Sequence, residues 1–295
     1  MWLAALQSRV EAVRVDRAGD RAVQHNGWMR RPVVVALVLV PLVLAAGFGI
    51  RSAYLDESSA QRPTLPAPRN PLRPDLVVSD LRDVLLSRKA DGSRSLFFTA
   101  AVANIGDGPF LVRGVRRQVG DAWRVTQRFV ERDGAMTERD VDGDLVFGGH
   151  GHEHWHVRLG ASYRLVARVD GKEVRRLVKA GYCFFDQTVF RPSLRGAPRA
   201  PRFLAAGCNG IEARVVDMGL SVGWSDPYTW LLPDQRLDVT GLPDGVYRLL
   251  ATADPDGWFD ETAESNNEAW VDVRIAKRAD GASVATVLRR SAPPR

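Results

Sequence analysis

The sequence predicts an all-β fold, a β-sandwich-like domain with long loops, for the chain beyond residue 73. Short runs that alternate polar and apolar residues are separated by Gly, Pro and Asp turn signals, which is typical of antiparallel strands. Long helical periodicity is absent after residue 50. The 295 residues suffice for one β domain of about 200 residues with a sizeable core.

An apolar segment precedes this domain. Residues 33–50 carry no charge, and as a helix they would be about 27 Å long, close to the hydrocarbon thickness of a bilayer. Arg30 and Arg31 precede the segment, so the positive-inside rule predicts cytoplasmic residues 1–31 and a transmembrane anchor or signal peptide at 32–50. The remainder of the chain is then expected outside the cytoplasm, membrane-anchored or secreted.

The length of the apolar segment favours an anchor over a signal peptide. In contrast, "MRRPVVVALVLV", which starts at Met29, is typical of a complete signal peptide, with residues 1–28 upstream of the true start. A buried core helix is the ordinary alternative, but the polar segment that follows offers it nothing to pack against.

The remaining boundaries follow from composition. Residues 51–73 are rich in Pro and polar side chains and predict an extended linker. The domain is expected at 74–276, followed by a C-terminal tail at 277–295. Strands are expected within 95–104, 125–134, 162–178, 235–257 and 269–275, with Asp-Gly turns after the second and inside the third. Gln187 to Asp217 predicts a long irregular loop.

Charge excludes one class of function. The net charge of +6 comes almost entirely from Arg, because the chain has only four lysines, and it is scattered. No basic run is interleaved with aromatic residues, so nucleic-acid binding is not expected.

Cys183 and Cys208 are the only two cysteines. An even number outside the cytoplasm predicts one disulfide. It would close a loop of about 25 residues and stabilise the fold by roughly 3–4 kcal/mol in the chain-entropy model.

Four of the five histidines lie in "HGHEHWH", residues 150–156. On a strand, alternate residues point to one side, so His152, His154 and His156 would share a face, with His150 extending the row. Imidazoles are common metal ligands, and three of them leave coordination positions open. A fortuitous surface row is the ordinary explanation, but four histidines at alternate positions favour a metal site. The spacing does not name the metal.

Four stretches together resemble the lysyl oxidase family. "HEHWHVRLGASYRL" resembles its copper-binding segment, and "GLSVGWSDPYTWLLPDQRLDVTGLPDGVYRLLATADP" is similar to its G-[IL]-S-x-G, D-x-Y, Q-x-[IL]-D-[IV]-T and P-x-G-x-Y motifs. "KAGYC" resembles its K-x-x-[FY]-C segment, and "ESNNEAWVDVRI" its closing strand. The resemblance covers roughly residues 74–275 and implies oxidation of primary amines, with peptidyl lysine among the candidates, to aldehydes by O₂, with release of ammonia and hydrogen peroxide.

The same resemblance implies the site residues. His152, His154 and His156 correspond to the copper ligands, with His150 as an alternate or neighbouring group. Lys179 and Tyr228 correspond to the precursors of lysine tyrosylquinone, a cofactor built from the protein itself. A lone Lys is ordinarily a solvated charge, but Arg could not serve as the nucleophilic amine, and Lys is rare here. Asp226 is a candidate base, or equally a turn residue.

A calcium site is a further implication. The matching residues are Asp75, Leu76, Glu261, Asn266 and Asn267, whose hard oxygen ligands suit Ca²⁺. Ala263 departs from the family pattern, because animal relatives carry an acid there. This chain can also form only one disulfide, whereas animal relatives have several.

Two alternatives from other classes remain. The first is a copper-binding protein without turnover, which would need neither Lys179 nor Tyr228. The second is a zinc hydrolase on the histidines, which lacks a nearby base because Glu153 would face away from them on a strand.

Overall fold

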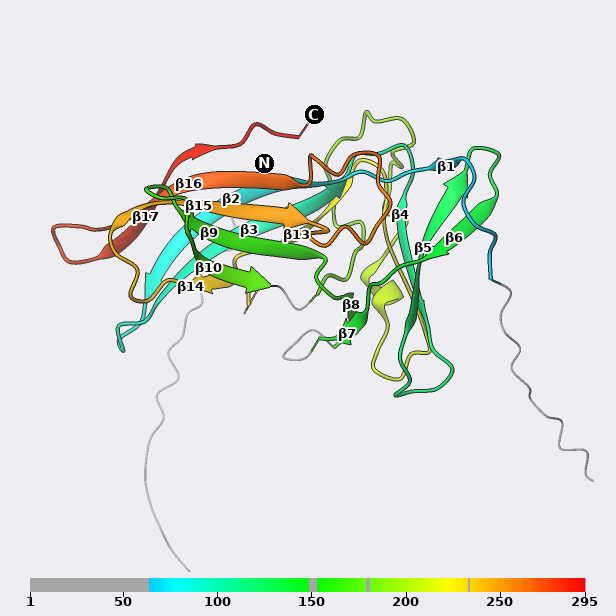
Figure 1. Ribbon diagram of the computed structural model, residues 1–295, viewed down its shortest axis with the longest axis horizontal. Coiled ribbons are helices and arrows are strands. Elements are labelled where there is room, and N and C mark those ends of the chain that lie inside the picture. Colours follow the sequence, from blue (N-terminus) through cyan, green and yellow to red (C-terminus); the bar gives the residue numbers. More distant parts are fainter. Residues whose placement is uncertain (1–63, 149–152, 179–180, 233, 295) are drawn as a thin grey trace, which may run out of the picture. The chain divides into compact units, whose positions relative to one another are not determined.

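Alternating runs of the sequence form antiparallel strands in the computed structural model, which describes residues 64–148, 153–178, 181–232 and 234–294 (Figure 1). Helical structure in these residues is limited to the 3-10 turn η1 (Ala205–Cys208). The prediction of an all-β fold is therefore confirmed.

The chain divides into two units, Met1–Ser58 and Ser59–Arg295, and all described residues belong to the second. The predicted cytoplasmic segment and the apolar segment 32–50 lie outside the described residues. Among the residues described, no helix is both long and apolar enough to cross a membrane.

Most strands belong to three five-stranded sheets, named here by a central strand. The β4 sheet has the order β1–β5–β4–β12 with β6 beside β5: β1 (Pro71–Leu72), β4 (Phe110–Val115), β5 (Arg124–Glu131), β6 (Met136–Asp140) and β12 (Val215–Leu220). The β15 sheet has the order β10–β9–β15–β16–β17: β9 (Ala161–Ala167), β10 (Glu173–Val178), β15 (Gly245–Ala253), β16 (Glu268–Lys277) and β17 (Ser283–Arg290).

The β3 sheet lies against the β15 sheet. It consists of β2 (Leu76–Arg88), β3 (Arg94–Asn104), β11 (Thr188–Val189), β13 (Trp224–Tyr228) and β14 (Arg236–Asp238). The ring of Phe98 on β3 meets that of Tyr163 on β9 edge-on, with centroids 4.8 Å apart. Residues 98–104 of β3 are buried without interruption, as expected of a strand covered on both faces.

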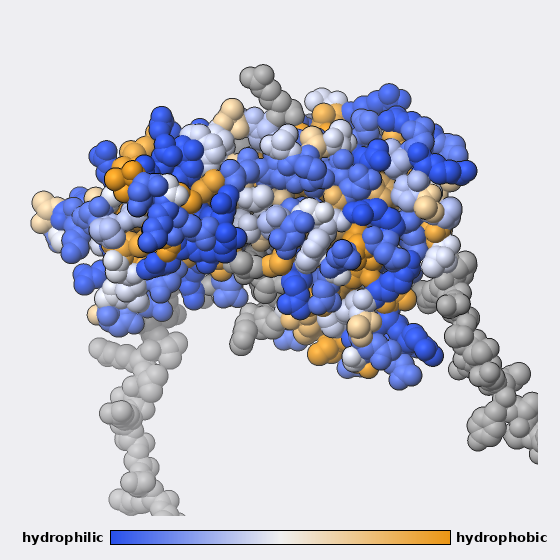
Figure 2. Space-filling model, viewed as in Figure 1, coloured by the Kyte–Doolittle hydropathy of each residue, from blue (hydrophilic) through white to orange (hydrophobic). Residues whose placement is uncertain are grey.

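The hydrophobic core continues from these two sheets to the β4 sheet. Phe110 on β4 packs edge-on against Phe184 and Phe259, at centroid distances of 5.0 and 4.7 Å. The face drawn in Figure 2 is mostly hydrophilic, with smaller apolar areas between the polar ones. Apolar area removed from water stabilises the fold at about 25 cal/mol per Å², so this continuous core is its main support.

A short hairpin made of β7 (Leu145–Phe147) and β8 (Trp155–Val157) follows β6 in the chain. The ring of Trp155 on β8 contacts Trp123, which lies just before β5, so the hairpin packs beside the β4 sheet (Figure 1). The histidine-rich segment leads into β8.

Both predicted Asp-Gly hairpins form. Gly134 (φ 86°) turns β5 into β6, and Gly171 (φ 72°) turns β9 into β10. Positive φ is accessible to Gly at little cost, which is why these dipeptides mark the turns.

The structure extends the domain at both ends beyond the expected boundaries of residues 74 and 276. Pro71–Leu72, expected in the linker, pairs with β5, and Glu131 accepts hydrogen bonds from the backbone N–H groups of Arg69 and Asn70. Residues 283–290, expected in a tail, form β17 and pair with β16. The cause is a further Asp-Gly hairpin, with Gly281 at φ 80°.

Candidate metal and cofactor site

The two described histidines of the histidine-rich segment lie on one side of the chain. His154 precedes β8 and His156 lies within it; their ring centroids are 4.5 Å apart, with planes 43° apart. His156 is buried and His154 partly buried. Trp155 between them turns away and donates its indole N–H to the carbonyl of Gly210 at 2.9 Å. The predicted alternation therefore holds for this pair, while His150 and His152 lie outside the described residues.

The "KAGYC" segment lies directly against the histidine strand. Val157 donates its N–H to the carbonyl of Tyr182 at 2.7 Å, and Tyr182 donates back to Val157 at 2.9 Å. A Cβ added to Gly181 would lie 2.3 Å from Cβ of His156, so this position has room only for glycine. Lys179 itself lies outside the described residues, two positions before Gly181.

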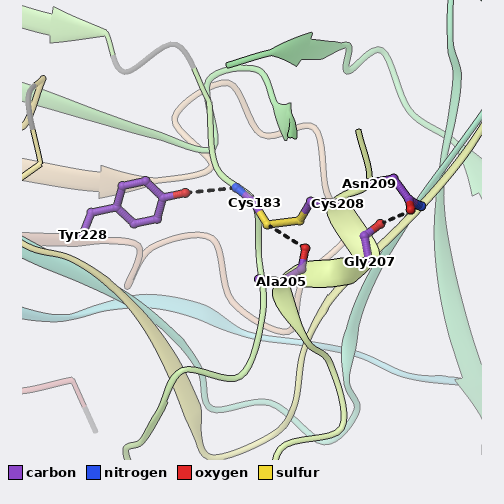
Figure 3. The surroundings of a disulfide bond; sticks show 6 residues. All are labelled: Cys183, Ala205, Gly207, Cys208, Asn209 and Tyr228. Atoms are coloured by element: carbon purple, nitrogen blue, oxygen red, sulfur yellow. Dashed lines mark hydrogen bonds between the residues drawn. A yellow bond between two sulfur atoms is a disulfide. The ribbon is translucent and has the colours of Figure 1, made fainter. Parts of the chain in front are cut away.

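The same segment also contacts Tyr228. The backbone N–H of Cys183 donates to the hydroxyl oxygen of Tyr228 at 3.0 Å (Figure 3). The ring of Tyr182 packs on that of Tyr228 with centroids 3.9 Å apart. Gly181, Tyr182 and Cys183 thus connect the histidine strand to Tyr228, which lies far away in the sequence.

Tyr228 is buried at the end of β13, where it pairs with Ala100 of β3. Burial raises the pKa of its phenol well above 10, and the negative charge of Asp226 raises it further. The hydrogen bond from Cys183 acts in the opposite direction. The phenol is therefore neutral at ordinary pH.

Asp226 lies within β13 and not in a turn. It is 1% exposed and pairs with Val102 of β3. It lies two positions before Tyr228, and the alternation of a strand puts both side chains on the same face. Its charge raises the pKa of three tyrosines, Tyr163, Tyr182 and Tyr228, which shows that the carboxylate and the phenols share one buried region.

A second pair of phenols supports this region. The hydroxyls of Tyr163 and Tyr182 are 2.5 Å apart, and both side chains are fully buried. Burial raises the pKa of Tyr163 to about 12 and that of Tyr182 well above 10. Sequence reasoning did not single out either residue, although Tyr182 lies inside "KAGYC" and the alternation of β9 directs Tyr163 inward.

The predicted disulfide between Cys183 and Cys208 is present, with Cα atoms 5.9 Å apart (Figure 3). It closes most of the expected loop, which contains only η1 and the two-residue strand β11 before β12 begins. Buried Asp186 anchors this loop by accepting hydrogen bonds from the N–H groups of Arg202 and Ser221 at 2.8 and 2.7 Å. The disulfide and Asp186 thus fix the backbone around Cys183, whose N–H contacts Tyr228.

A separate cluster of oxygen atoms forms where the start of β2 meets the segment before β16. Asn266 donates to the Asp75 carboxylate at 2.9 Å, Asn267 donates to that of Glu261 at 3.2 Å, and the Leu76 N–H also donates to Glu261. The structure therefore brings together all five residues predicted for calcium. For Leu76, the contact seen is through its N–H.

Two carboxylates that sequence reasoning missed complete the cluster. Carboxylate oxygens of Asp254, Glu261 and Glu264 lie within 4.8 Å of one another. Asp254 also accepts hydrogen bonds from the N–H groups of Trp258 and Phe259, which closes a turn. Glu264 directly follows Ala263, the position at which the expected acid is missing.

The cluster has polar groups that the described protein does not satisfy. The Oδ1 atoms of Asn266 and Asn267 are buried without a hydrogen-bond partner among the described residues. Burial raises the pKa of Glu261 to about 9 and that of Asp254 to about 6, because desolvation disfavours the charged form. Buried amide oxygens beside concentrated carboxylates suit a hard cation.

No protein-family model and no curated protein matches this chain.

Proposed function

We propose that this chain is a copper- and quinone-dependent amine oxidase of the lysyl oxidase type, acting outside the cytoplasm. It converts a primary amine, O₂ and water into an aldehyde, ammonia and hydrogen peroxide. The observation that carries the proposal is the position of Gly181–Cys183, which contacts His156 on one side and Tyr228 on the other. Two histidines and a buried Tyr thus meet one short segment, and in the sequence the rare Lys179 precedes Gly181 by two positions.

The donor set fits copper. His154 and His156 present two imidazoles on one side, and His152 precedes His154 by two positions in the sequence. Imidazole nitrogens suit Cu(II), and three of them leave room for a further ligand. The disulfide supports an oxidising compartment, consistent with an extracytoplasmic domain.

Lys179 and Tyr228 are the proposed precursors of the quinone. Copper would supply redox chemistry with O₂ during maturation, and the quinone an electrophilic carbonyl for the substrate amine. The Cys183 N–H orients the oxygen of Tyr228, and Tyr182 covers one face of its ring, which excludes water there. Asp226, buried on the same face of β13, is the proposed acceptor of the α-proton of the substrate.

We also propose that the domain is a β-sandwich, as the sequence predicts. The packing of the β3 sheet on the β15 sheet supports this architecture. The substrate class is a primary amine, including lysine side chains of proteins. Three of the four lysines of the chain are described, and they lie in exposed turns or strand ends, at Lys89, Lys172 and Lys277.

Copper-loaded, air-matured protein tests the proposal through reaction with phenylhydrazine. We expect a coloured adduct and peroxide release from amines, both lost in Tyr228→Phe, with copper retained. Tyr247→Phe is the matched control, because that buried tyrosine of β15 donates to the carbonyl of Pro243 and lies outside the site. Bound copper without an adduct in the unaltered protein would favour the copper-binding protein without turnover, and bound zinc in place of copper the hydrolase.

We further propose that the cluster of Asp75, Glu261, Asn266 and Asn267 binds calcium, with Asp254 and Glu264 as additional carboxylates. The unpartnered amide oxygens of Asn266 and Asn267 support this assignment. Glu264 would supply the charge that Ala263 cannot.

A further inference from the structure

Arg116, which directly follows β4, packs on two tryptophans beside the histidine strand. Its guanidinium carbon lies 4.5 Å from the ring centroid of Trp123 and 4.8 Å from that of Trp155. The two rings also meet each other edge-on at 4.9 Å. Arg116 is 7% exposed, so both cation–π contacts are shielded from water. Cation–π contacts are stronger when they are desolvated.

The same guanidinium holds the segment that follows Cys208. Nε of Arg116 donates to the carbonyl of Ala213 at 2.7 Å, and Nη2 donates to that of Ile211 at 2.5 Å. Its backbone N–H donates to Arg214 at 3.0 Å. The guanidinium therefore donates hydrogen bonds to backbone carbonyls and packs its planar face against the indole rings.

Trp155 joins these two sets of contacts to the histidines. Its indole N–H donates to Gly210, in the segment that Arg116 holds, and its neighbours in the chain are His154 and His156. A shift of the Trp155 ring would therefore move the backbone that carries both imidazoles. The Trp155 ring is fixed by the guanidinium of Arg116, by edge-on contacts with Trp123 and Phe147, and by the carbonyl of Gly210.

We propose that Arg116 is a positioning residue for the copper site. It fixes Trp155 against the segment 209–214, and thereby fixes the orientation of His154 and His156 relative to the disulfide-closed loop that contacts Tyr228. The inference rests on the proposed function, because it concerns the geometry of the proposed copper ligands. Lys cannot replace Arg116, since an ammonium group lacks the planar fork that serves two carbonyls and stacks on rings.

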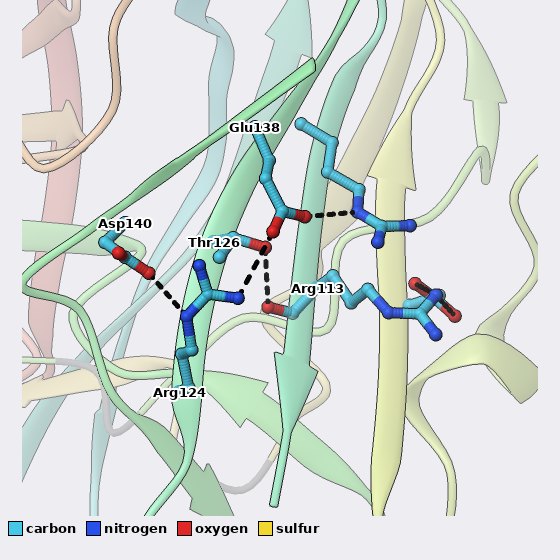
Figure 4. Close-up of polar contacts among 7 residues, drawn as sticks. Arg113, Arg124, Thr126, Glu138 and Asp140 are labelled. Carbon is cyan, nitrogen blue, oxygen red and sulfur yellow. Dashed lines mark hydrogen bonds and ion pairs between the residues drawn. The ribbon is translucent and has the colours of Figure 1, made fainter. Parts of the chain in front are cut away.

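The test compares Arg116→Lys with Arg113→Lys in the full chain. Arg113 lies within β4, three residues before Arg116 (Figure 4), and its guanidinium binds Asp217 near the surface at 2.8 Å. In metal-free protein, Arg116→Lys should exchange the amide hydrogens of residues 209–214 about tenfold faster, as expected when charged hydrogen bonds and cation–π contacts are lost. In copper-loaded protein, it should change the hyperfine splitting of the Cu(II) electron paramagnetic resonance spectrum while still binding copper. Arg113→Lys should change neither.

Identical exchange and identical Cu(II) spectra in Arg116→Lys and the unaltered protein would overturn the inference. If the unaltered protein binds no copper, the proposed function fails, and the positioning role fails with it. If Arg116→Lys does not fold, Trp123→Phe replaces it, because it weakens one cation–π contact without touching the carbonyls. A Cu(II) spectrum unchanged by Trp123→Phe would then count against the proposal.

Discussion

At the scale of single residues, Gly181 shows how closely the "KAGYC" segment approaches the histidine strand. A Cβ at this position would lie 2.3 Å from Cβ of His156 and 2.8 Å from the carbonyl oxygen of Val157. Neither neighbour is the flexible end of a side chain. Any other residue must therefore displace the histidine strand.

Gly181→Ala should consequently lower copper occupancy, measured by elemental analysis, and destabilise the fold by about 1–3 kcal/mol, as overpacking does. Gly210→Ala is the matched control, since a Cβ there meets nothing within 4 Å. Normal copper occupancy in Gly181→Ala would show that the "KAGYC" segment does not set the position of His156.

The side chains of this site differ in how far the sequence predicts them. The spacing of two residues predicts that His154 and His156 share a face, because strand alternation is local. The assignment of Tyr228 came from the resemblance alone. The contact between Tyr228 and Cys183 joins residues that are 45 positions apart in the sequence, and no local pattern encodes it. Tyr163 and Tyr182 were missed for the same reason.

At the scale of elements, the buried carboxylate of Asp272 ties the β15 sheet together. Asp272 on β16 accepts hydrogen bonds from Arg248 on β15 at 2.8 and 3.1 Å and from Arg289 on β17 at 3.1 Å. Arg248 also packs on Trp270, with its guanidinium carbon 3.6 Å from the ring centroid. The pKa of Asp272 is lowered from its ordinary value of 3.8, chiefly by the hydrogen bond from Arg248.

A lowered folded-state pKa means that Asp272 stabilises the protein fully above pH 3.8 and loses this contribution as the pH falls through the folded-state value. Asp272→Asn should therefore lower the free energy of unfolding by roughly 1–3 kcal/mol at neutral pH, with the deficit shrinking in acid. Denaturant titrations at neutral and at acidic pH measure this loss of unfolding free energy. Asp280→Asn, in the exposed β16–β17 turn, should stay within about 0.5 kcal/mol of the unaltered protein. An equal loss in both variants would contradict this account.

Asp-Gly pairs made some elements predictable, because the turn chemistry is local. The turns at Gly134 and Gly171 were anticipated in this way. The same signal at Gly281 was available, yet the polar run Lys277–Asp280 made the following residues resemble a tail, so β17 was missed. Half of its residues are exposed, which weakens the apolar alternation of an edge strand.

At the scale of the whole molecule, the oxygen cluster joins the start of the domain to the segment before β16. It fixes Asp75 and Leu76 to residues 254–267, which are far away in the sequence. Composition and periodicity could not predict this junction, and only the resemblance pointed to it. The approach of Asp254 and Glu264 to Glu261 depends on the fold, so the sequence did not predict their place in the cluster.

Calcium should raise the melting temperature, and a chelator should lower it. A ligand at 100 times its dissociation constant stabilises the fold by about 2.7 kcal/mol. The gain should be larger near pH 8 than near pH 5.5, because protons compete for Glu261, whose pKa is raised to about 9. Glu261→Gln should abolish the gain, whereas Glu268→Gln, at an exposed ion pair with Arg164, should keep it. A calcium response that persists in Glu261→Gln would place the ion elsewhere.

The central claim is that Lys179 and Tyr228 become one cofactor, and tryptic peptide mapping tests it most directly. The chain is matured with copper and air, then reduced, alkylated and digested. The peptides covering residues 177–195 and 215–236 should appear as a single crosslinked species, with the mass of the two peptides joined and the tyrosine oxidised to the quinone. Tyr228→Phe should abolish that species. If protein that holds copper instead yields peptide 180–195, released by cleavage after a free Lys179, and peptide 215–236 with an unmodified mass, the amine oxidase assignment is wrong.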